Sequence, residues 1–374
     1  MKHVLHITHT NIENDSRILK EISTLESAGY KVSGLGVVHD EASKRSEIPL
    51  GAYLYNIRLS SRTFVYLPKT FRHFISMFEL IIKILPRAVF SRPDIVHCHD
   101  TLVLPVGVLV AFITRSKLIY DAHELESDRN GLTFLQSKLT LLAEKFVWPL
   151  IDGLIVVSPS IQRWYHNNIG FKTSEVILNS PVLDTKIPKT SRYLREKFQI
   201  PENCRIFVYV GILNNGRGLD LIAQVFKDVK ISSHVVFLGY GEMSEQIKFL
   251  ANNYPNFHYH EAVQHSEVVP IIKSADFGLC LVECVSLSDY YCLPNKLFEY
   301  CFAGIPVLAS NFPDISLLVS EYSLGKCCEL NIKSVTDAII EIEKSENKLS
   351  IDKDLYELSW SVQSFKLQQF YSRL

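Results

Sequence analysis

The sequence predicts an α/β protein built from two doubly wound parallel-sheet domains. Short apolar runs typical of buried strands alternate with amphipathic stretches of helical spacing along most of the chain. This alternation stops at residues 181–191, where Pro181, Asp184 and Pro188 interrupt all periodicity, and it then restarts. With 374 residues, 47% of them hydrophobic, the chain can bury two cores and is longer than one typical domain.

Composition and charge exclude several classes of protein. The formal net charge of -1 gives no global electrostatic basis for binding nucleic acid. Residues 1–3 lead into an apolar strand rather than a secretory signal, so we expect the chain in the cytoplasm, with its eight cysteines reduced. The longest apolar run, 102–113, is too short to span a membrane and contains Pro105 and Gly107, which favours a core helix.

The amino-terminal half opens with the unit from which doubly wound sheets grow. A strand at 4–8 is followed by a polar loop, a helix capped by Asp15 and a second strand at 31–38. Ligands of such sheets bind at the carboxyl ends of the strands, beside this first loop. Asp15 and Arg17 can therefore contact a ligand, or they can serve only as helix cap and salt-bridge partner.

Residues 62–92 combine basic and aromatic side chains at helical spacing. Only one acidic residue, Glu79, accompanies the cations of this segment. The cations are Arg62, Lys69, Arg72, Lys83, Arg87 and Arg92. Such a segment can lie on an anionic membrane surface, or it can form a helix whose apolar face joins the core. We favour a peripheral membrane contact.

Two polar strand tips follow. A strand at 93–100 ends in His97, His99 and Asp100, and a strand at 117–124 ends in His123 and Glu124. The apolar helix between these strands makes a right-handed crossover, which brings both tips to the same edge of a parallel sheet. Because all five side chains are of metal-ligand types, a metal site is one interpretation of this edge.

Three elements complete the first half. Residues 154–157 form a buried strand, and Ser158 followed by Pro159 is a favourable start for a helix. A further strand at 176–179 leads into the interrupted stretch.

The second half restarts with a strand, a glycine-rich loop at 211–218 and a helix at 219–229. The strand covers 206–210. Glycines such as Gly211 let the backbone approach a phosphate, and the guanidinium of Arg217 can bind that phosphate bidentately. The loop matches neither the Walker nor the dinucleotide-binding pattern.

A similar turn, Gly239-Tyr240-Gly241, follows a strand at 235–238, and its glycines would let the chain pass close to a nucleotide. Strands at 258–260 and 277–281 come next. The tail at 355–374 has apolar residues at helical spacing and is too apolar to be free of the rest of the fold.

The stretch 293–310 predicts a loop, a short helix and a strand, because Pro294 suits the first turn of a helix and Gly304 its end. Lys296 and Glu299 lie near the amino terminus of this helix, whose free N–H groups attract anions. Lysine suits a phosphate, and a carboxylate can accept hydrogen bonds from both hydroxyls of a ribose. The alternative is an ordinary helix with an exposed ion pair.

The stretch 293–310 closely resembles the signature of retaining glycosyltransferases of family 4, which carries a Glu-x7-Glu pattern. Glu299 matches the second glutamate, which in the family holds the ribose of the sugar nucleotide. Tyr291 replaces the first glutamate, which in the family lies near the donor sugar. The two polar strand tips also resemble those of the family, and His123 matches the histidine that points at the donor sugar. This resemblance explains the histidines better than a metal site does.

The loops are similar to those of the family as well. In the family an arginine and a Lys-Gly pair hold the diphosphate, whereas here Ile212 takes the place of the arginine and Arg217-Gly218 that of the pair. Arg217 alone would then carry the charge. Asp15-Ser16-Arg17 resembles the first loop of the family, beside which the acceptor and the diphosphate bind.

The resemblance implies the GT-B fold, in which two Rossmann-like domains face a cleft and the last helix crosses back to the first domain. We expect an acceptor-binding domain at 1–185, a nucleotide-sugar-binding domain at 190–355 and the returning helix at 356–374. The implied reaction moves a hexosyl-type sugar, with retained configuration, from a nucleotide diphosphate to a glycan or lipid-linked acceptor in bacterial surface polysaccharide synthesis. A sugar-nucleotide epimerase, a phosphorylase and a non-catalytic GT-B subunit are the alternatives.

The expected catalytic residues are Arg217 and His123. The expected donor-binding residues are Gly211, Arg217, Gly239, Tyr240, Gly241, Tyr291, Asn295, Lys296 and Glu299. On the acceptor side we expect Asp15, Arg17, His99, Asp100 and Glu124. We expect a UDP- or GDP-sugar as donor, no metal, no cofactor and no nucleic acid. The membrane contact through 62–92 would be at the inner face of the membrane.

Overall fold

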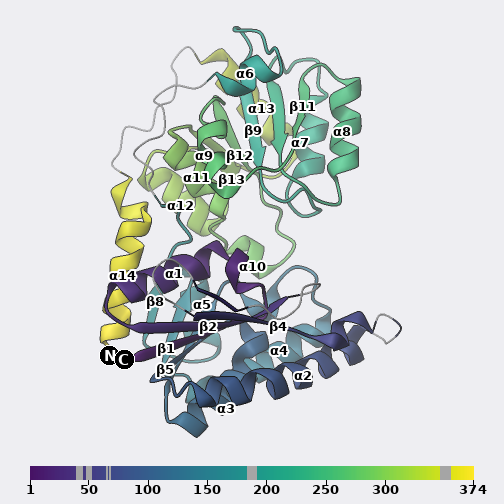
Figure 1. Ribbon diagram of the computed structural model, residues 1–374. Coiled ribbons are helices and arrows are strands. Elements are labelled where there is room, and N and C mark those ends of the chain that lie inside the picture. The colour runs from purple at the N-terminus through teal and green to yellow at the C-terminus, as the bar shows by residue number, and fades with distance from the viewer. Residues whose placement is uncertain (39–44, 48–52, 65, 67–68, 183–191, 346–354) are drawn as a thin grey trace. The chain divides into compact units, whose positions relative to one another are not determined.

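The computed structural model describes residues 1–38, 45–47, 53–64, 66, 69–182, 192–345 and 355–374 (Figure 1). These residues form two compact units. The first unit comprises Met1–Ile177 and Gln363–Leu374, and the second comprises Leu178–Val362. Each unit contains an open, mostly parallel sheet, which confirms the predicted fold class. The predicted domain boundaries at 185 and 190 lie outside the described residues.

The sheet of the first unit has eight strands in the order β3-β4-β2-β1-β5-β6-β7-β8. Neighbouring strands pair in parallel, except that the edge strand β3 runs antiparallel to β4. The strands are β1 (His3–Ile7), β2 (Lys31–Val38), β3 (Arg45–Glu47), β4 (Tyr53–Arg58), β5 (Ile95–His99), β6 (Lys117–Ala122), β7 (Gly153–Val156) and β8 (Ser174–Val176). Chain order reverses between β1 and β5, the switch point at which such sheets bind ligands.

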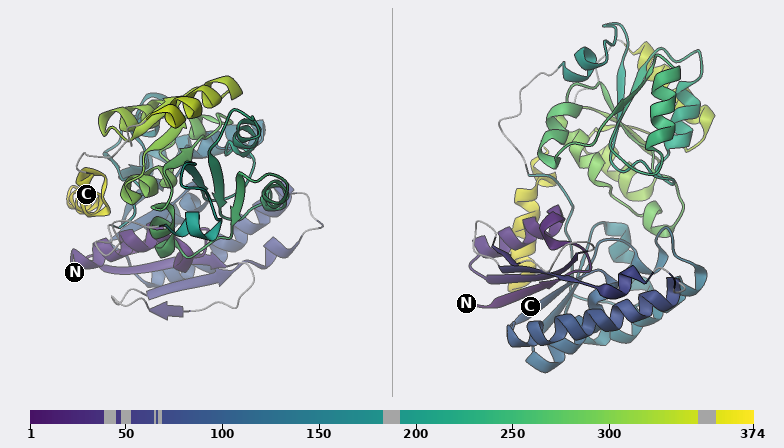
Figure 2. Two further views of the ribbon diagram at one scale, coloured as in Figure 1. Left: turned by 90° about the horizontal axis from the view of Figure 1, so that it is seen from above. Right: turned by 45° about the vertical axis from the view of Figure 1, so that its right-hand side comes forward.

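Helices cover both faces of this sheet (Figures 1 and 2). The chain moves in one direction from β1 to β2 and in the other from β4 through β7, so right-handed crossovers place α1 on one face and α2, α3 and α4 on the other. The helices are α1 (Ser16–Ser27), α2 (Lys69–Phe90), α3 (Leu104–Thr114), α4 (Phe134–Val147) and α5 (Pro159–Asn168), with short turns η1 (Ile12–Asn14), η2 (Ser60–Thr63), η3 (Thr101–Val103), η4 (Glu126–Asp128) and η5 (Trp148–Leu150).

Local sequence signals explain where these helices begin. The Asp15 side chain accepts hydrogen bonds from the backbone N–H groups of Arg17 and Ile18, so the predicted cap of α1 is confirmed. Ser158 caps α5 in the predicted way, with Pro159 as the first helical residue. No helix in the described part of the chain is long and apolar enough to cross a bilayer.

The last helix, α14 (Trp360–Ser372), brings the chain terminus back to the first unit, as predicted. The Tyr371 hydroxyl lies 2.6 Å from Nδ1 of His97 on β5. The Phe370 ring fills the space above Gly153, where an added Cβ would lie 2.6 Å from the ring. A side chain at position 153 would therefore separate α14 from β7.

The second unit has a six-stranded parallel sheet in the order β11-β10-β9-β12-β13-β14. The strands are β9 (Ile206–Val210), β10 (His234–Leu238), β11 (Phe257–His260), β12 (Phe277–Cys280), β13 (Val307–Ser310) and β14 (Gly325–Cys328). The helices are α6 (Tyr193–Lys197), α7 (Leu219–Phe226), α8 (Ser244–Asn253), α9 (His265–Ile272), α10 (Leu287–Tyr290), α11 (Asn295–Ala303), α12 (Pro313–Glu321) and α13 (Ile332–Lys344), with the turn η6 (Tyr356–Leu358).

Tyr300 fixes α11 against the central strands of this sheet. Its ring covers Gly278 on β12, where an added Cβ would lie 2.2 Å from the ring. Its buried hydroxyl accepts a hydrogen bond from the backbone N–H of Val210 at 3.0 Å and lies 3.1 Å from the carbonyl oxygen of Val208. Because a buried hydroxyl needs these partners, the rotation and depth of α11 are tightly set.

Several predicted boundaries were wrong by a few residues. The helix predicted at 219–229 ends at Phe226, and the strand predicted at 176–179 lies at Ser174–Val176. Pro294 is the N-cap of α11 rather than part of its first turn, whereas Gly304 ends the helix with φ 73 as expected. The ends of helices and strands depend on tertiary contacts, and the apolar periodicity of the sequence carries no information about these contacts.

Candidate functional site

In the first unit, His123 lies just beyond the carboxyl end of β6, where it meets Asp121 and Asp100. Its Nε2 is 3.1 Å from Oδ2 of Asp121, and its Nδ1 is 3.7 Å from Oδ1 of Asp100. The side chain of His123 is 20% exposed, whereas Asp121 is fully buried. The structure thus brings the two predicted polar strand tips together at one edge of the sheet, with His123 turned partly to solvent.

The two carboxylates favour the protonated form of His123. Burial by itself would lower the pKa of this imidazole, but Asp100 and Asp121 outweigh burial and raise the pKa to about 10. The reciprocal effect holds for Asp121. Burial would raise the pKa of its carboxyl, but Arg17 and His123 hold it well below its usual range. His123 is therefore a cation at neutral pH.

A line of buried histidines continues inward from His123. Nε2 of His123 is 3.1 Å from Nδ1 of His99, and Nε2 of His99 is 2.9 Å from Nδ1 of His6. His99 and His6 are both fully buried. The ring of His99 therefore contacts other rings and supports His123 from behind, and its predicted place on the acceptor side stays a prediction.

Arg17 also points into the interior. Its guanidinium donates to Asp121 at 3.0 and 3.2 Å and to the carbonyl oxygen of Ile177 at 2.8 Å, and it lies 3.1 Å from Glu21. The side chain of Arg17 is 3% exposed, so its guanidinium faces the interior rather than solvent. The structure thus shows Asp15 capping α1 and Arg17 holding Asp121, and their predicted place on the acceptor side stays a prediction.

The buried polar cluster offers donor atoms close enough for a metal. One atom each from His6, Glu21, His97 and His99 lies within 4.8 Å of the others. However, the rings of His97 and His99 stack in near-parallel planes 18° apart, with centroids 4.4 Å apart. Stacked rings direct their lone pairs side by side rather than to one point, and the Arg17 cation adjoins Glu21. In this group of four the arrangement suits hydrogen bonding. His99, Asp121 and His123 form a second group whose ligand atoms lie within 4.8 Å of one another, and the expected absence of a metal stays a prediction.

Sequence reasoning missed Glu21, His6, His9 and Asp121 as members of this site. Alternation along β6 was an available signal, because Asp121 and His123 are two residues apart. The strand register was not available. It places His99 beside Asp121 and His6 beside His97.

Two acceptor-side candidates keep some access to solvent. Glu124 is exposed. Asp100 is 7% exposed, has a backbone φ of 67, and lies with Oδ2 3.5 Å from Nδ1 of His9. A non-glycine residue with positive φ is uncommon and is often found at functional sites.

In the second unit, the glycine-rich loop runs from β9 to α7 and carries Arg217. Gly218 is the N-cap of α7 with φ 74, and no side chain in the described residues caps this helix end. The side chain of Arg217 is 40% exposed, and its Nη1 lies 3.9 Å from Oδ1 of Asp289 in α10. The guanidinium can therefore reach a ligand while Asp289 limits its range of positions.

Gly239 and Gly241 serve the packing of one loop on another. A Cβ on Gly239, whose φ is 153, would lie 1.9 Å from the carbonyl oxygen of Gly211. A Cβ on Gly241 would lie 2.4 Å from the carbonyl oxygen of Leu213. The loops after β9 and β10 thus touch through their backbones, and the neighbouring Tyr240 is 65% exposed.

Lys296 lies over the start of the glycine-rich loop. Its Nζ is 3.7 Å from the centroid of the Tyr209 ring, a cation–π contact. A Cβ on Gly211 would lie 3.9 Å from this Nζ, so the lysine and the loop are neighbours. Pro294 offers no side-chain cap to α11, and Asn295 at its first position is exposed. Loop, lysine and helix amino terminus together form a positively polarised surface suited to phosphate.

Glu299 is buried one turn further along α11. It is 8% exposed, and its Oε1 lies 3.6 Å from Nε2 of His265 in α9. The alternative of an exposed ion pair therefore does not hold for this carboxylate. Tyr291, half-buried, follows α10 and has its ring 5.3 Å from that of Tyr290.

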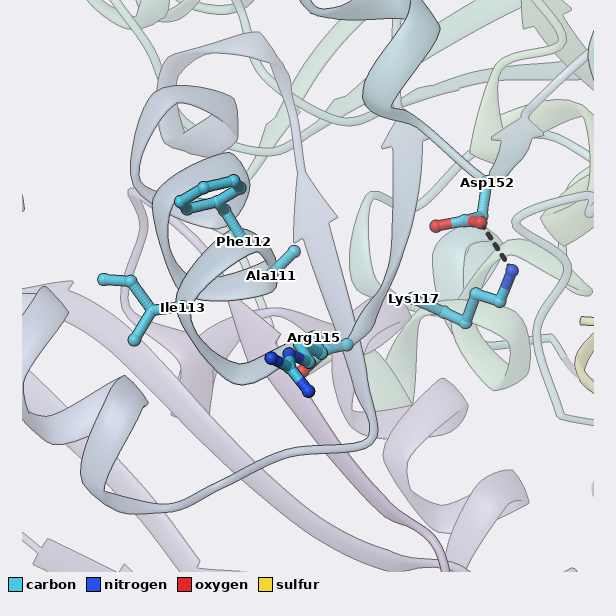
Figure 3. A pocket seen from close by; sticks show the side chains of 7 residues that line it. Ala111, Phe112, Ile113, Arg115, Lys117 and Asp152 are labelled. Carbon is cyan, nitrogen blue, oxygen red and sulfur yellow. Dashed lines mark hydrogen bonds and ion pairs between the residues drawn. The ribbon is translucent and has the colours of Figure 1, made fainter.

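An open hollow of about 720 Å³ lies elsewhere in the first unit, between the end of α3 and the start of β6 (Figure 3). Its lining includes Phe112, Arg115, Lys117 and Asp152, and the last two form an ion pair at 2.8 Å. Lys117 begins β6, whereas His123 follows its other end. The hollow is therefore separate from the polar site.

Solved structures similar over the whole chain define the class of the fold. They include sucrose-phosphate synthase from Thermosynechococcus elongatus, with a TM-score of 0.80 at 15% identity, covering 100% of this chain and 99% of that one. HepE from Anabaena in complex with UDP-glucose has a TM-score of 0.72 at 13% identity, covering 100% of both chains. The catalytic domain of starch synthase IV from Arabidopsis thaliana, bound to ADP and acarbose, has a TM-score of 0.68 at 12% identity. The match covers 100% of this chain and 99% of that chain. The fold is GT-B.

Family models identify the chain more closely. Residues 17–185 match Glycosyltransferase Family 4, and residues 191–354 match Glycosyl transferases group 1. The chain belongs to glycosyltransferase family 4. An uncharacterized glycosyltransferase of Methanocaldococcus jannaschii is 25% identical over 177 residues, which are 43% of this chain and 43% of that relative's length.

The charge state of His123 can be tested with the variant Asp100→Asn. Asparagine tolerates the positive φ of position 100, so the backbone there should not change. Losing one carboxylate lowers the pKa of His123 from about 10 toward its ordinary value of 6.5. In NMR titrations of labelled histidine, we expect His123 to titrate near neutral pH in this variant and not in the wild type.

Asp152→Asn, at the opposite end of β6, is the matched control and should leave His123 unchanged. Since the folded-state pKa is the higher one, protonated His123 stabilises the fold below pH 6.5, and this contribution is lost as the pH rises through about 10. A wild-type His123 that titrates near pH 6.5 would contradict the assignment.

Proposed function

We propose that this protein is a retaining glycosyltransferase that moves a sugar from a nucleotide-diphosphate donor to a hydroxyl of a glycan or lipid-linked acceptor. The observation that carries the proposal is a grouping in the second unit. It comprises the glycine-rich loop, Lys296, the amino terminus of α11, to which Pro294 offers no side-chain cap, and the buried carboxylate of Glu299. This grouping would offer a phosphate site at the start of α11 and a diol site at Glu299 on the same helix.

The donor diphosphate is placed at the loop and the start of α11. Negative charge builds on the leaving diphosphate as the glycosidic bond breaks, and Arg217, Lys296 and the helix N–H groups would stabilise that charge. Glu299, shielded from water, would accept hydrogen bonds from the ribose hydroxyls. Gly239, Tyr240, Gly241, Tyr291 and Asn295 would line the remainder of the donor site.

We assign His123 to the donor sugar, as a cation held in place by Asp121 and Asp100. Because Asp121 accepts from Nε2, the Nδ1–H group would be the donor to the sugar, and an imidazolium held in this way costs no reorganisation during the reaction. The acceptor is assigned to the first unit, near Asp100 and Glu124. Surface polysaccharide synthesis in bacteria, at the inner face of the membrane, is the process that we propose for this acceptor.

The donor is proposed to be a UDP- or GDP-sugar. HepE structures carry UDP or UDP-glucose, and starch synthase IV carries ADP, so neighbours of this fold accept different bases. No metal or cofactor is included in the proposal, because protein cations and helix N–H groups can neutralise the diphosphate.

Residues 62–92 are proposed to contact the membrane. One face of α2 is core, with Leu80, Ile84 and Ala88 buried, while Phe78 and Ile82 are 49% and 70% exposed. One face of α2 therefore belongs to the core, as one of the two interpretations predicted, and exposed apolar side chains remain on the outer face. The side chains of Lys69 and Phe74 lie outside the described residues.

Two alternatives use the same fold. A sugar-nucleotide epimerase or a phosphorylase would also bind phosphates, but the resemblance of 293–310 favours a transferase. A non-catalytic subunit is suggested by Tyr291 and Ile212 at two family positions. Product formation from a donor and an acceptor separates both from the proposal, whereas donor binding alone does not.

Replacing Glu299 by Gln should weaken nucleotide binding without unfolding the protein. The change keeps the shape of the side chain and removes the charge that strengthens hydrogen bonds to the diol, so we expect about a tenfold loss or more in donor affinity by calorimetry. Glu245→Gln, an exposed change on α8, should bind as the wild type does. Equal affinity in both variants would remove Glu299 from the donor site.

Arg217→Ala should lower turnover at saturating donor by about a hundredfold or more, as loss of an oxyanion donor does in other enzymes. Arg217→Lys should recover part of the rate, because it restores a point charge without the bidentate grip. Arg192→Ala, which removes an exposed arginine of the same unit, controls for loss of charge. If Arg217→Ala kept nearly the wild-type turnover, the proposed binding of the diphosphate by Arg217 would be wrong.

Chelation should leave activity unchanged, since the proposed neutralisation of the diphosphate uses only protein groups. The measurement is turnover with and without EDTA, together with the metal content of the purified protein. Activity that is lost in EDTA and restored by a divalent cation would show that the buried histidine cluster, or the diphosphate itself, needs a metal.

A further inference from the structure

The outer surface of α4 is apolar. Leu135, Leu139, Leu142 and Phe146 are 61%, 52%, 64% and 80% exposed. Their spacing of four, three and four residues places them in one stripe along the helix. A surface helix normally presents its polar side to water, so α4 has the reverse arrangement.

The inner side of α4 explains why the stripe faces outward. Glu144 is fully buried, and its Oε1 accepts hydrogen bonds from the hydroxyls of Tyr165 at 2.6 Å and Tyr120 at 2.8 Å. Thr101 adds a third hydroxyl at 3.3 Å. Rotating the helix to bury the stripe would break these bonds and leave a buried carboxylate without partners, which is costly. The buried hydrogen bonds of Glu144 thus fix the rotation of α4 with its apolar stripe facing outward.

The neighbouring helices also carry exposed apolar residues. On the same face of the sheet, α2 contacts α3 and α3 contacts α4 (Figure 1). Outward apolar residues occur on both, at Leu109, Phe112 and Ile113 of α3 and at Phe71, Phe78 and Ile82 of α2. Three helices packed side by side make a surface about 20 Å across, which is broad for a peptide groove.

Cations border this surface. The exposed charged residues of α4 are Lys138 and Lys145, because its one acidic residue is the buried Glu144. Nζ of Lys138 lies 4.3 Å from the centroid of the Phe134 ring. On α2, Glu79 is paired with Lys83 at 2.7 Å, which leaves Arg72 and Arg87 to add positive charge. An apolar surface bordered by cations is complementary to an anionic lipid bilayer.

We propose that α4 is a membrane-binding helix whose apolar stripe enters the headgroup region of an anionic bilayer while Lys138 and Lys145 contact the lipid phosphates. The inference rests on the membrane contact proposed for 62–92 and extends it from α2 across α3 to α4. The contact would hold the first unit at the surface where a lipid-linked acceptor resides.

The test is co-sedimentation of the full-length protein with vesicles of phosphatidylcholine and phosphatidylglycerol. We expect the wild type to pellet, less so at high salt or with phosphatidylcholine alone. Leu142→Glu combined with Phe146→Glu should lower vesicle partitioning about tenfold or more. Both positions are exposed, so folding should persist and can be checked by thermal melting and calorimetric donor affinity.

Phe249→Glu, which places the same charge on an exposed aromatic residue of the second unit, should leave vesicle binding unchanged. Wild-type protein that stays in the supernatant, or a double variant that pellets as the wild type does, would overturn the proposal. A wild-type dimer that the double variant dissociates, without vesicle binding, would instead assign the stripe to a second copy of the chain. Donor affinity is measured separately from vesicle binding. Failure of the proposed membrane contact can therefore be distinguished from failure of the proposed function.

Discussion

The buried carboxylate of Asp121 is the interaction on which the polar site of the first unit depends. Burying an unpaired carboxylate costs several kcal/mol, so Asp121 needs strong partners. Arg17 supplies two hydrogen bonds from α1, and His123 supplies a cation from the end of β6. The same contacts link α1 to the sheet and fix the ring of His123. Removing any one of these three groups leaves buried charge on the others.

The second unit builds its candidate site mainly from backbone. The loops after β9 and β10 approach so closely that Gly239 cannot carry a side chain, and Tyr300 fixes the position of α11 beside them. This packing presents backbone N–H groups and the Lys296 cation to the same place. Arg217 is an exposed charge, since its side chain is 40% exposed and its Nη1 lies 3.9 Å from Oδ1 of Asp289. A closely packed backbone site with one exposed cation would suit the leaving group of the proposed reaction, whose charge grows as the bond breaks.

Membrane contact and catalysis would use different parts of the first unit. The polar site lies at the carboxyl ends of β5 and β6, whereas the outward stripe lies on the helices that cover one face of the same sheet. Glu144 connects the two levels of structure, because it fixes the rotation of α4 through Tyr120 of β6 and Tyr165 of α5. The buried position of Glu144 thus keeps the apolar stripe of α4 on the outer side of the helix.

The sequence alone determined the two α/β units, the family and the stretches that carry the candidate site, because strand and helix periodicity and local motifs are contained in neighbouring residues. It could place His123 and Glu299 at element ends, but it could not show that Arg17 and His99 turn inward or that Asp121 joins them. No helix was predicted for residues 134–147, so both α4 and the side of it that is buried came from the structure. Only the tertiary structure decided these points, since burial and strand register depend on residues distant in the chain.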